Sequence, residues 1–308
     1  MITTTALQKP SKVDLVIYDL KQFIREERLN KDNFWQLDSM LFVINSELKK
    51  GTLTNDGISR IRSWFDSEFL RETIHGLGFM KPNGYPGDYL FLDRIYTRHI
   101  SKNPKYGIWD EYVQQHAAPN AVRNRKAYLK KLVLEKAADN SRLNLLNVVS
   151  GSGRELFELY GQFQVKNVNT TCVEIDQGAI NFSKRLNNEY LENINYVHSN
   201  VFKFRNNKTY DMIWSAGLFD YLNDKAFVFV LKKFKDWLSP RGEIIIGNYN
   251  EEYNPSRDYL EILGDWHLIH RTEAQLISLA NEAGLDNCIV KVNRLEDNVI
   301  LYLSLKMK

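Results

Sequence analysis

The stretch LLNVVSGSGREL, residues 145–156, joins an apolar run, two closely spaced glycines and the start of a helical pattern. Gly151 and Gly153 permit a tight turn and let a ligand approach the backbone closely. A second apolar run ends at Glu174, 21 residues after Gly153, near the spacing at which an acidic residue meets ribose hydroxyls. The segment therefore predicts a strand, a ligand-binding loop and a helix, and a purely structural turn is the alternative.

A regular alternation of strand-like and helix-like segments extends beyond this stretch. Short β-rich runs alternate with helical segments, which is typical of a parallel sheet with crossover helices. The predicted strands cover residues 143–149, 168–174, 194–198, 210–214 and 243–248. Helices are expected to begin near residues 153, 177 and 223, and residues 238–242 are expected to turn into the fifth strand. A helix over 272–283 and a closing hairpin from 288–292 and 299–305 complete the pattern.

The chain before residue 140 shows helical spacing of apolar residues and no strand pattern. One helix is expected to end at Lys50-Gly51, and the next to be capped by Thr54 or Asn55 and to run to about residue 75. A loop rich in glycine and proline follows, with a helix resuming at Asp88 or Tyr89. We therefore expect a helical N-terminal cap domain over 1–118 and a Rossmann-like α/β domain over 119–308.

The predicted loop is better suited to S-adenosyl-L-methionine than to a dinucleotide. A third glycine that pyrophosphate binding normally requires would fall at Leu156, and Glu155 at the start of the helix would repel phosphates. After the third strand, Asn200 offers an amide for an adenine edge, and Val201 and Phe202 offer apolar side chains for its faces. A simple turn at Asn200 is an equally good interpretation.

Composition limits the other classes of function. The chain has 308 residues, of which 44% are hydrophobic and 26% charged, so a folded protein with a core is expected. Its 41 basic and 38 acidic residues give a net charge of +3 without a basic stripe, which argues against nucleic acid. The only cysteines, Cys172 and Cys288, suggest neither a disulfide framework nor a zinc site. With no signal peptide or membrane span visible, a cytoplasmic protein is expected.

Four motifs, SGSG, CVEID, YDMIWSAG and LSPRGEIII, give the run from Leu143 to Lys306 a resemblance to class I S-adenosylmethionine-dependent methyltransferases. The resemblance implies a seven-stranded sheet with its last strand antiparallel and a cofactor at the carboxyl ends of the strands. Asn147 and Val149 depart from the family pattern, which has Asp and Gly at these places. The methionine end of the cofactor is therefore expected to be held in a different way.

Four further segments, GYPGDY (84–89), APNAVRNR (118–125), SAGLFDYL (215–222) and GDWHLIHRT (264–272), resemble the bacterial 3-hydroxypalmitic acid methyl ester biosynthesis proteins. That similarity covers most of the chain from about residue 75 onward. It implies a hydroxy fatty acid as one acceptor. It bears on the fold and the cofactor more strongly than on the acceptor.

Candidate site residues follow from the loop, the strand ends and these segments. The candidate catalytic residues are Tyr85, Asp88, Tyr89 and Tyr221, with helix capping as the alternative for Asp88. The candidate cofactor-binding residues are Arg123, Ser150, Gly151, Ser152, Gly153, Glu174, Ile175, Asn200, Val201, Phe202, Ala216 and Gly217. No metal ligands are predicted.

Further residues near the predicted site have a binding or a structural interpretation. Arg125, like Arg123, is suited to gripping a carboxylate, or else lies on a solvated surface. Phe219 is expected in the core. The residues that would line or roof the acceptor cleft are Asp220, Asn248, Tyr249, Trp266, His267, His270 and Arg271, with a structural role favoured for the histidines.

The predicted function is methyl transfer to a small-molecule carboxylate or hydroxyl. A carboxylate acceptor is ionised at pH 7 and needs only orientation, whereas a hydroxyl needs a base. Two alternatives stay open: a S-adenosylmethionine-consuming enzyme that displaces the aminocarboxypropyl group or cyclises it, releasing methylthioadenosine, and a non-catalytic binding module. A small-molecule acceptor is the expected partner, and a homo-oligomer is left open.

Overall fold

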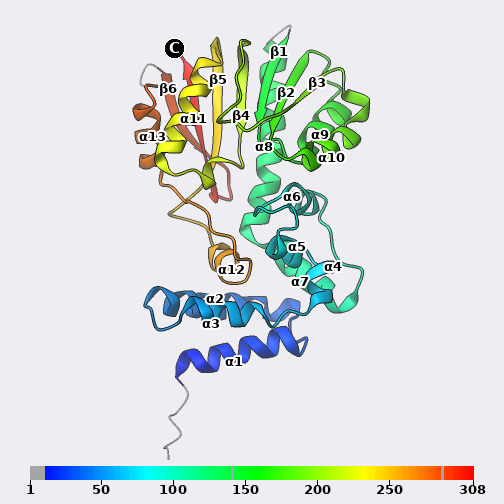
Figure 1. The fold of residues 1–308 in the computed structure, drawn as a ribbon, viewed down its shortest axis with the longest axis vertical. Coiled ribbons are helices and arrows are strands. Elements are labelled where there is room, and N and C mark those ends of the chain that lie inside the picture. The colour runs from blue at the N-terminus through cyan, green and yellow to red at the C-terminus, as the bar shows by residue number, and fades with distance from the viewer. Residues whose placement is uncertain (1–10, 140–141, 286–287) are drawn as a thin grey trace, which may run out of the picture. The chain divides into compact units, whose positions relative to one another are not determined.

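The computed structural model describes residues 11–139, 142–285 and 288–308 (Figure 1). The chain forms two compact units. The helical unit contains Met1–Gly87, His99–Gln115 and Ser256–His267, and the sheet unit contains Asp88–Arg98, His116–Pro255 and Leu268–Lys308. The units are thus interleaved along the sequence, in contrast to the single boundary at 118/119 that the sequence predicts.

The helical unit consists of seven α-helices and one short 3-10 helix within the described residues. They are α1 (Lys12–Arg25), the 3-10 helix Lys31–Asn33, α2 (Phe34–Lys49), α3 (Asn55–Arg62), α4 (Ser67–Glu72), α5 (Ile74–Met80), α7 (Pro104–Gln115) and α12 (Arg257–Ile262). Gly51, with φ of 76°, follows the end of α2, and Thr54 caps α3 by accepting from Gly57 N–H, as predicted.

The predicted continuous helix from Asn55 to residue 75 is wrong, because the structure breaks it into α3, α4 and α5. Asp66 accepts a hydrogen bond from the backbone N–H of Phe69 at 2.8 Å and starts α4. Thr73 likewise accepts from Gly76 N–H at 2.9 Å and starts α5. Short polar side chains that bond to nearby backbone groups favour helix ends over helix interiors, and this explains the two breaks.

Arg62 ties the distant segment that contains α12 to the rest of the helical unit. Its guanidinium donates to the carbonyls of Ile262 at 2.8 Å and Glu261 at 2.6 Å, and to Asp265 Oδ1 at 2.8 Å. Lys81 adds a second ion pair to Asp265 at 2.9 Å. These contacts occur between positions roughly 200 apart in sequence, so local pattern alone does not reveal them.

The sheet unit contains one seven-stranded sheet with the order β3-β2-β1-β4-β5-β7-β6. Its strands are β1 (Leu143–Val148), β2 (Val168–Glu174), β3 (Ile194–His198), β4 (Tyr210–Ser215), β5 (Leu238–Tyr249), β6 (Cys288–Arg294) and β7 (Ile300–Met307). The strands β3-β2-β1-β4-β5 pair in parallel, and β7 is antiparallel to β5 and to β6. This confirms the expected Rossmann-like class I methyltransferase sheet with an antiparallel last strand.

The predicted turn at residues 238–242 is wrong, because β5 already begins at Leu238. Tyr210 pairs with Leu238 and Met212 pairs with Glu243, so the register shifts across the intervening residues. The strand therefore accommodates the Pro240 and Gly242 region as an irregularity rather than starting after it, which is where proline is tolerated in a sheet.

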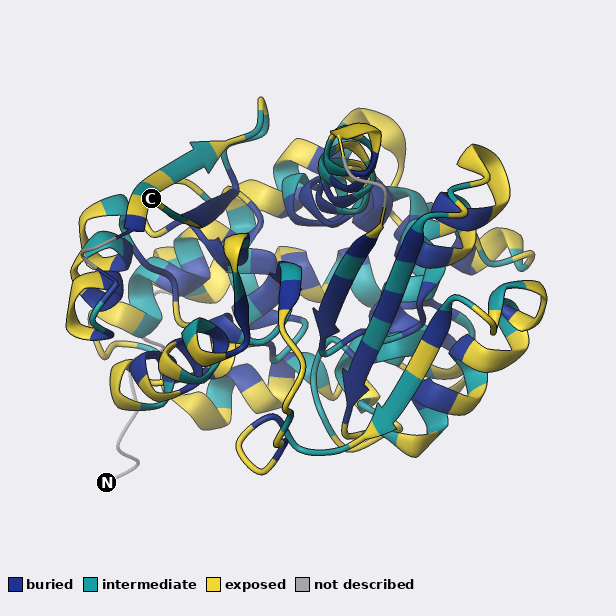
Figure 2. Ribbon diagram, turned by 90° about the horizontal axis from the view of Figure 1, so that it is seen from above, coloured by how far each residue is buried: buried dark blue, intermediate teal, exposed yellow. Residues whose placement is uncertain are grey.

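Helices cover both faces of the sheet (Figure 1). The helices α11 (Asp224–Asp236) and α13 (Glu273–Glu282) contact each other and the β5-β7-β6 half of the sheet. The helices α9 (Arg154–Phe163) and α10 (Gln177–Leu186) also contact each other, and α10 contacts β2 and β3. The unit also contains α6 (Tyr89–Tyr96) and α8 (Ala117–Asp139). Burial follows the strands, whereas the outer faces of the helices are exposed (Figure 2).

Three general observations apply to the part of the chain that the structure describes. Its helices include none that is long and apolar enough to cross a membrane. Within the same residues, no group of three or more His, Cys, Asp or Glu side chains is arranged to hold a metal ion. Cys172 and Cys288 are both buried, and no disulfide joins them within these residues.

Candidate functional site

The loop between β1 and α9 has a backbone conformation that differs from that of an ordinary turn. Val149, Gly151 and Gly153 have φ of 59°, 54° and 64°, all in the left-handed region. A β-branched residue is rarely found there, so Val149 marks stored strain at the start of the loop. Strain of this kind persists where the surroundings fix the backbone, and it concentrates at functional sites.

The two glycines of the loop have different roles. A Cβ added at Gly151 would meet nothing within 4 Å, so the backbone here borders open space. A Cβ added at Gly153 would lie 2.0 Å from Ser183 Oγ, so this glycine is required for packing against α10. Gly151 is therefore the position at which a ligand can approach the loop, and Gly153 holds the loop against its neighbour.

The hydroxyl groups of Ser150 and Ser152 are buried, and no hydrogen-bond partner for either is found in the described chain. Buried polar groups without partners are uncommon in folded proteins. Two such hydroxyls in one glycine loop fit a site whose polar partners come from a bound molecule. Cofactor binding by Ser150 and Ser152 stays a prediction.

Glu174, at the end of β2, is fixed by three backbone amides. Its Oε2 accepts from Gly151 N–H at 2.9 Å, and its Oε1 accepts from Ile175 N–H at 2.8 Å and Asp176 N–H at 3.1 Å. Burial raises the pKa of Glu174, while these amides act in the opposite direction. An ionised carboxylate has about four acceptor positions, so at least one is free for a ligand hydroxyl. The exposed side chain of Ile175 lies next to it in sequence.

The residues after β3 are used largely within the protein. Asn200 Oδ1 accepts from Phe202 N–H at 2.9 Å, which favours the interpretation of Asn200 as a turn residue. Val201 is buried in the core cluster, and the Phe202 ring stacks on Phe229 with centroids 6.0 Å apart. Contact of these side chains with an adenine ring stays a prediction, and the structure gives the two apolar side chains other partners.

On α8 the structure distinguishes the two arginines. Arg125 is 8% exposed and donates to the carbonyl of Ala216 at 2.6 Å and to the Tyr96 hydroxyl at 3.3 Å. A Cβ on Gly217 would lie 3.8 Å from its guanidinium. Arg125 therefore reaches the end of β4, and the alternative of a solvated surface position is wrong for it.

Arg123, the arginine that the sequence assigns to the cofactor, points elsewhere. Its guanidinium donates to Asn120 Oδ1 and to the carbonyl of Ile95, the latter at 3.4 Å. Burial, with a smaller contribution from Arg98, lowers the pKa of Arg123 to about 10. Its proposed cofactor contact stays a prediction. The sequence assigns Arg123 to the cofactor and leaves Arg125 open between carboxylate binding and a solvated position, and it does not indicate Tyr96.

The residues after β4 form a buried network with the end of β5. Asp220 Oδ1 accepts from Tyr249 N–H at 2.7 Å, and burial raises the pKa of Asp220 to about 7. Tyr221, the predicted catalytic residue, is 38% exposed on the same short 3-10 helix, Phe219–Tyr221. Phe219 is fully buried, which confirms its core assignment.

Arg271, a predicted roof residue, is buried and bonds to groups of the protein itself. It donates to the carbonyls of Phe219 at 3.0 Å and Leu222 at 2.6 Å, and to Asn248 Oδ1 at 2.9 Å. His270 is also buried and lies 3.0 Å from Asn254 through its Nε2. The two remaining predicted roof residues, Trp266 and His267, belong to the helical unit.

The GYPGDY segment crosses between the units. Tyr85 belongs to the helical unit, whereas Asp88 and Tyr89 belong to the sheet unit. Asp88 caps α6 by accepting from Phe91 N–H at 2.9 Å, which is the alternative interpretation of this residue. The Tyr89 ring packs on Phe182 at 5.5 Å, and burial, with the nearby Asp176 and Asp88, raises its pKa. Catalytic roles for all three stay predictions.

Two further interactions position the loop, and the sequence analysis did not find them. Asp93 on α6 forms a two-contact ion pair with Arg154 at the start of α9, at 2.9 Å for each contact. Asn187 Nδ2 donates to the carbonyl of Gly153 at 3.2 Å. Neither pair has a local spacing signal in the sequence, because the partners are 61 and 34 residues apart.

The order of the seven strands, with β7 antiparallel to β5, is that of the class I methyltransferase fold. Residues 145–242 match the family described as a methyltransferase domain. No curated protein matches the sequence at a significant level.

Solved structures share this fold at low sequence identity. A possible exported protein from Bordetella parapertussis has a TM-score of 0.64 at 15% identity, over 96% of this chain and 97% of that chain. The magnesium protoporphyrin IX methyltransferase from Synechocystis PCC 6803 with bound S-adenosylmethionine has a TM-score of 0.52 at 8% identity, over 74% of this chain and 96% of that chain. The same enzyme with bound S-adenosylhomocysteine has a TM-score of 0.53 at 10% identity, with 75% and 96% covered.

Proposed function

We propose that the protein is an S-adenosyl-L-methionine-dependent methyltransferase that acts on a small-molecule carboxylate or hydroxyl. The observation that carries the proposal is the Glu174 carboxylate, which three backbone amides hold beside the open backbone of Gly151. The methyltransferase-domain match over residues 145–242 and the fold shared with cofactor-bound methyltransferases support the same cofactor.

The residues of the loop suit the parts of this cofactor. The free acceptor position on Glu174 suits a ribose hydroxyl, and the unpartnered hydroxyls of Ser150 and Ser152 suit its polar methionine end. When bound, the cofactor supplies a methyl group activated by its positively charged sulfur. The contribution of the protein is then to hold the acceptor atom in line, since positioning lowers the barrier to such a displacement substantially.

Arg125 supports a carboxylate acceptor. Its guanidinium is buried, its hydrogen-bond partners are a neutral carbonyl and a hydroxyl, and it forms no ion pair with any described residue. Buried charges are normally paired, and guanidinium binds carboxylates with two parallel hydrogen bonds. The buried carboxyl groups of Asp220 and Glu155 interact with it electrostatically but form no ion pair, so a carboxylate acceptor at the end of β4 would provide a direct partner. We therefore take a hydroxy fatty acid as the first acceptor to test.

A hydroxyl acceptor would require a base, and Asp220 is suited to that role in the sheet unit. Its pKa, raised by burial to about 7, lies close to physiological pH, where a general base works best. The phenols of Tyr89 and Tyr221 are proposed to orient the acceptor. Tyr85 and Asp88 are kept as further candidates. Exchange of each tyrosine for phenylalanine, with turnover as the readout, tests these roles one residue at a time.

A second reaction on the same cofactor is favoured by the altered first motif. Val149 keeps a bulky side chain at a left-handed position, and Asn147 Nδ2 donates to Glu155 Oε1 at 3.1 Å. Neither arrangement is available to the Gly and Asp of the usual pattern. A differently folded methionine end would expose the aminocarboxypropyl carbon to attack, with release of methylthioadenosine.

The products distinguish the two reactions. The protein is incubated with S-adenosylmethionine, with and without 3-hydroxypalmitate, and the nucleoside products are separated by chromatography. S-adenosylhomocysteine that forms only with the acceptor supports methyl transfer, and methylthioadenosine that forms steadily without acceptor overturns it. At a cofactor concentration below saturation, Glu174→Ala should strongly reduce either product, whereas the exposed control Lys232→Gln should change neither. Cofactor binding without any product across a panel of carboxylic acids would favour a non-catalytic module.

The acceptor contact is tested separately with Arg125→Gln. If Arg125 receives the carboxylate, the KM for the acid should rise at least about tenfold, as expected from losing a charge-assisted contact, while cofactor affinity is kept. The cytoplasmic location is also a proposal, since one solved relative is described as a possible exported protein. Cell fractionation decides it.

A further inference from the structure

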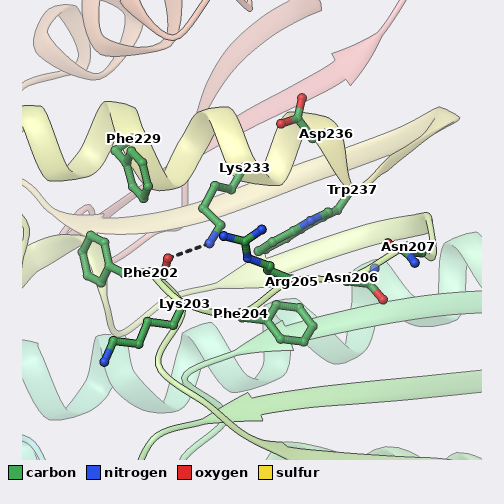
Figure 3. A pocket seen from close by; sticks show the side chains of 10 residues that line it. All are labelled: Phe202, Lys203, Phe204, Arg205, Asn206, Asn207, Phe229, Lys233, Asp236 and Trp237. Atoms are coloured by element: carbon green, nitrogen blue, oxygen red, sulfur yellow. Dashed lines mark hydrogen bonds between the residues drawn. The ribbon is translucent and has the colours of Figure 1, made fainter.

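A pocket of about 630 Å³ lies in the sheet unit, lined by Phe202–Asn207, Phe229, Lys233, Asp236 and Trp237 (Figure 3). We call it the α11 pocket, because four of its residues come from α11 or the residue that follows it. The others come from the connection between β3 and β4. Its volume lies within the range of small-molecule binding sites.

Most of the α11 pocket lies away from the proposed cofactor loop, although Phe202, a candidate cofactor residue that follows the end of β3, also lines it. Asn207 precedes the start of β4 at Tyr210, and Trp237 directly precedes the start of β5 at Leu238. Ser150 and Glu174 instead lie at the carboxyl ends of β1 and β2. Because these four strands run parallel, their starts and their ends lie at opposite edges of the sheet.

Lys233 is held in place at the centre of the pocket. Its Nζ donates to the carbonyls of Val201 and Phe202, each at 2.9 Å. The same ammonium lies 5.3 Å from the Trp237 ring centroid and 5.8 Å from that of Phe229. An ammonium group has three N–H donors, so one remains for a ligand.

The pocket contains three cationic side chains that form no ion pairs within the described chain. In Figure 3 the Arg205 guanidinium lies beside Lys233, and Lys203 is on the same loop. Burial, and then the charge of Arg205, lowers the pKa of Lys233. Within the described chain, none of the three cations forms an ion pair, including with Asp236 on the pocket wall. An anion between Lys233 and Arg205 would remove their mutual repulsion.

The walls favour a flat ring as the body of that anion. Phe202 and Phe229 stack with an interplanar angle of 15° and are 38% and 49% exposed, which is unusual for neighbouring large apolar side chains. Phe204 and Trp237 pack edge to face with centroids 5.0 Å apart. Aromatic surfaces of this kind bind planar ligands by stacking.

We propose that the α11 pocket is a second binding site, which takes a small aromatic anion: a planar ring that carries one phosphate, sulfonate or carboxylate group. Lys233 and Arg205 bind the anionic group, and the exposed aromatic pair contacts the ring. The proposal goes beyond methyl transfer and does not depend on it.

Calorimetric titration with 1-naphthyl phosphate tests the site in the full chain, saturated with S-adenosylhomocysteine to fill the cofactor loop. One binding site is expected, with inorganic phosphate and 1-naphthol each at least about tenfold weaker, because each supplies only half of the interaction. Arg205→Gln should weaken naphthyl phosphate about tenfold. Arg205 forms no hydrogen bond with any described residue, so this variant should fold normally.

Two further variants complete the test. Lys233→Gln should also lose affinity, and its thermal midpoint shows whether loss of the two carbonyl contacts disturbs the fold. Lys232→Gln, exposed on the same helix and outside the pocket lining, should bind like the wild type. No binding of naphthyl phosphate, or equal affinity in wild type and Arg205→Gln, would overturn the proposal. If S-adenosylhomocysteine itself does not bind, the proposed function fails, whereas this comparison still decides the pocket.

Discussion

The backbone N–H of Gly151 donates a hydrogen bond to Glu174 Oε2 at 2.9 Å, and this contact joins the loop after β1 to the end of β2. The two residues are 23 positions apart in the sequence. The carboxylate therefore orders the loop before any ligand arrives. A ligand that bonds to Glu174 and approaches Gly151 meets groups whose positions are already set, which lowers the entropic cost of binding.

Replacement of Glu174 by alanine should weaken S-adenosylhomocysteine binding by about 10- to 100-fold, since charge-assisted hydrogen bonds contribute about 1.5–3 kcal/mol. Calorimetry measures the change. Asp176→Ala, which alters the neighbouring carboxylate, serves as the control and should have a smaller effect. Unchanged affinity in Glu174→Ala would remove Glu174 from the site.

The same carboxylate predicts a pH dependence of binding. Burial raises the pKa of Glu174, so it protonates at a higher pH than an ordinary glutamate. Protonation removes the ionised acceptor, and S-adenosylhomocysteine affinity should therefore fall as the pH falls through the raised pKa. Binding measured from about pH 7 down to about pH 4.5 checks this. The lower limit lies near the ordinary pKa of glutamate. Glu174→Gln should flatten the profile, and an equally steep profile in that variant would assign the dependence to another group.

Substitutions at Gly151 and Gly153 should differ in their effects on ligand affinity and on the stability of the fold. Gly153→Ala places a Cβ 2.0 Å from Ser183 Oγ and adds left-handed strain, so it should destabilise the fold by more than about 1 kcal/mol relative to Gly151→Ala. Gly151→Val meets no atom within 4 Å but adds left-handed strain of about 1–2 kcal/mol, and it should also reduce ligand affinity, because its side chain occupies the approach to the loop. Denaturant unfolding and calorimetry on the same variants measure the two effects. Equal loss of stability at both positions would contradict the assignment.

At position 149 a glycine variant should be more stable than an alanine variant, which is the reverse of the usual order of stability. At its φ of 59°, glycine carries no Cβ penalty, so Val149→Gly should be more stable than Val149→Ala by about 1 kcal/mol. Val148, in the preceding strand, is the matched control and should show alanine as the more stable substitute. Urea unfolding of the four variants gives the comparison. This expected difference in stability depends only on the backbone conformation at position 149. A more stable Val149→Ala than Val149→Gly would therefore refute the prediction.

Asp220 should make stability depend on pH. Burial raises its pKa to about 7 from an ordinary value near 4, so the folded state binds a proton that the unfolded state has released. Its contribution to stability is therefore fully present below about pH 4 and lost as the pH rises through about 7. Asp220→Asn keeps an acceptor for Tyr249 N–H and should remove this decline. Thermal midpoints of wild type and variant between these pH values should diverge as the pH rises, and parallel curves would argue against the shift.

The sequence by itself determined those features of this protein that depend on neighbouring residues. The strand boundaries of β2 and β3, the cap at Thr54 and the glycine turn at Gly151 all follow from local propensity and period. A parallel sheet with helices between its strands also follows, because only that arrangement buries alternating apolar runs and helices. The methyltransferase resemblance supplied the antiparallel last strand, which pairing of β7 with β5 confirms.

The tertiary structure alone decided which side chains those elements place together. Arg123 and Arg125 are two positions apart on α8, so they lie on different faces of the helix, and only packing determines which face is buried. Arg125 meets Ala216, 91 residues away, and Arg62 brings α12 into the helical unit across about 200 residues. Contacts of this length depend on the whole fold, whereas a propensity or a motif extends over about one element of secondary structure.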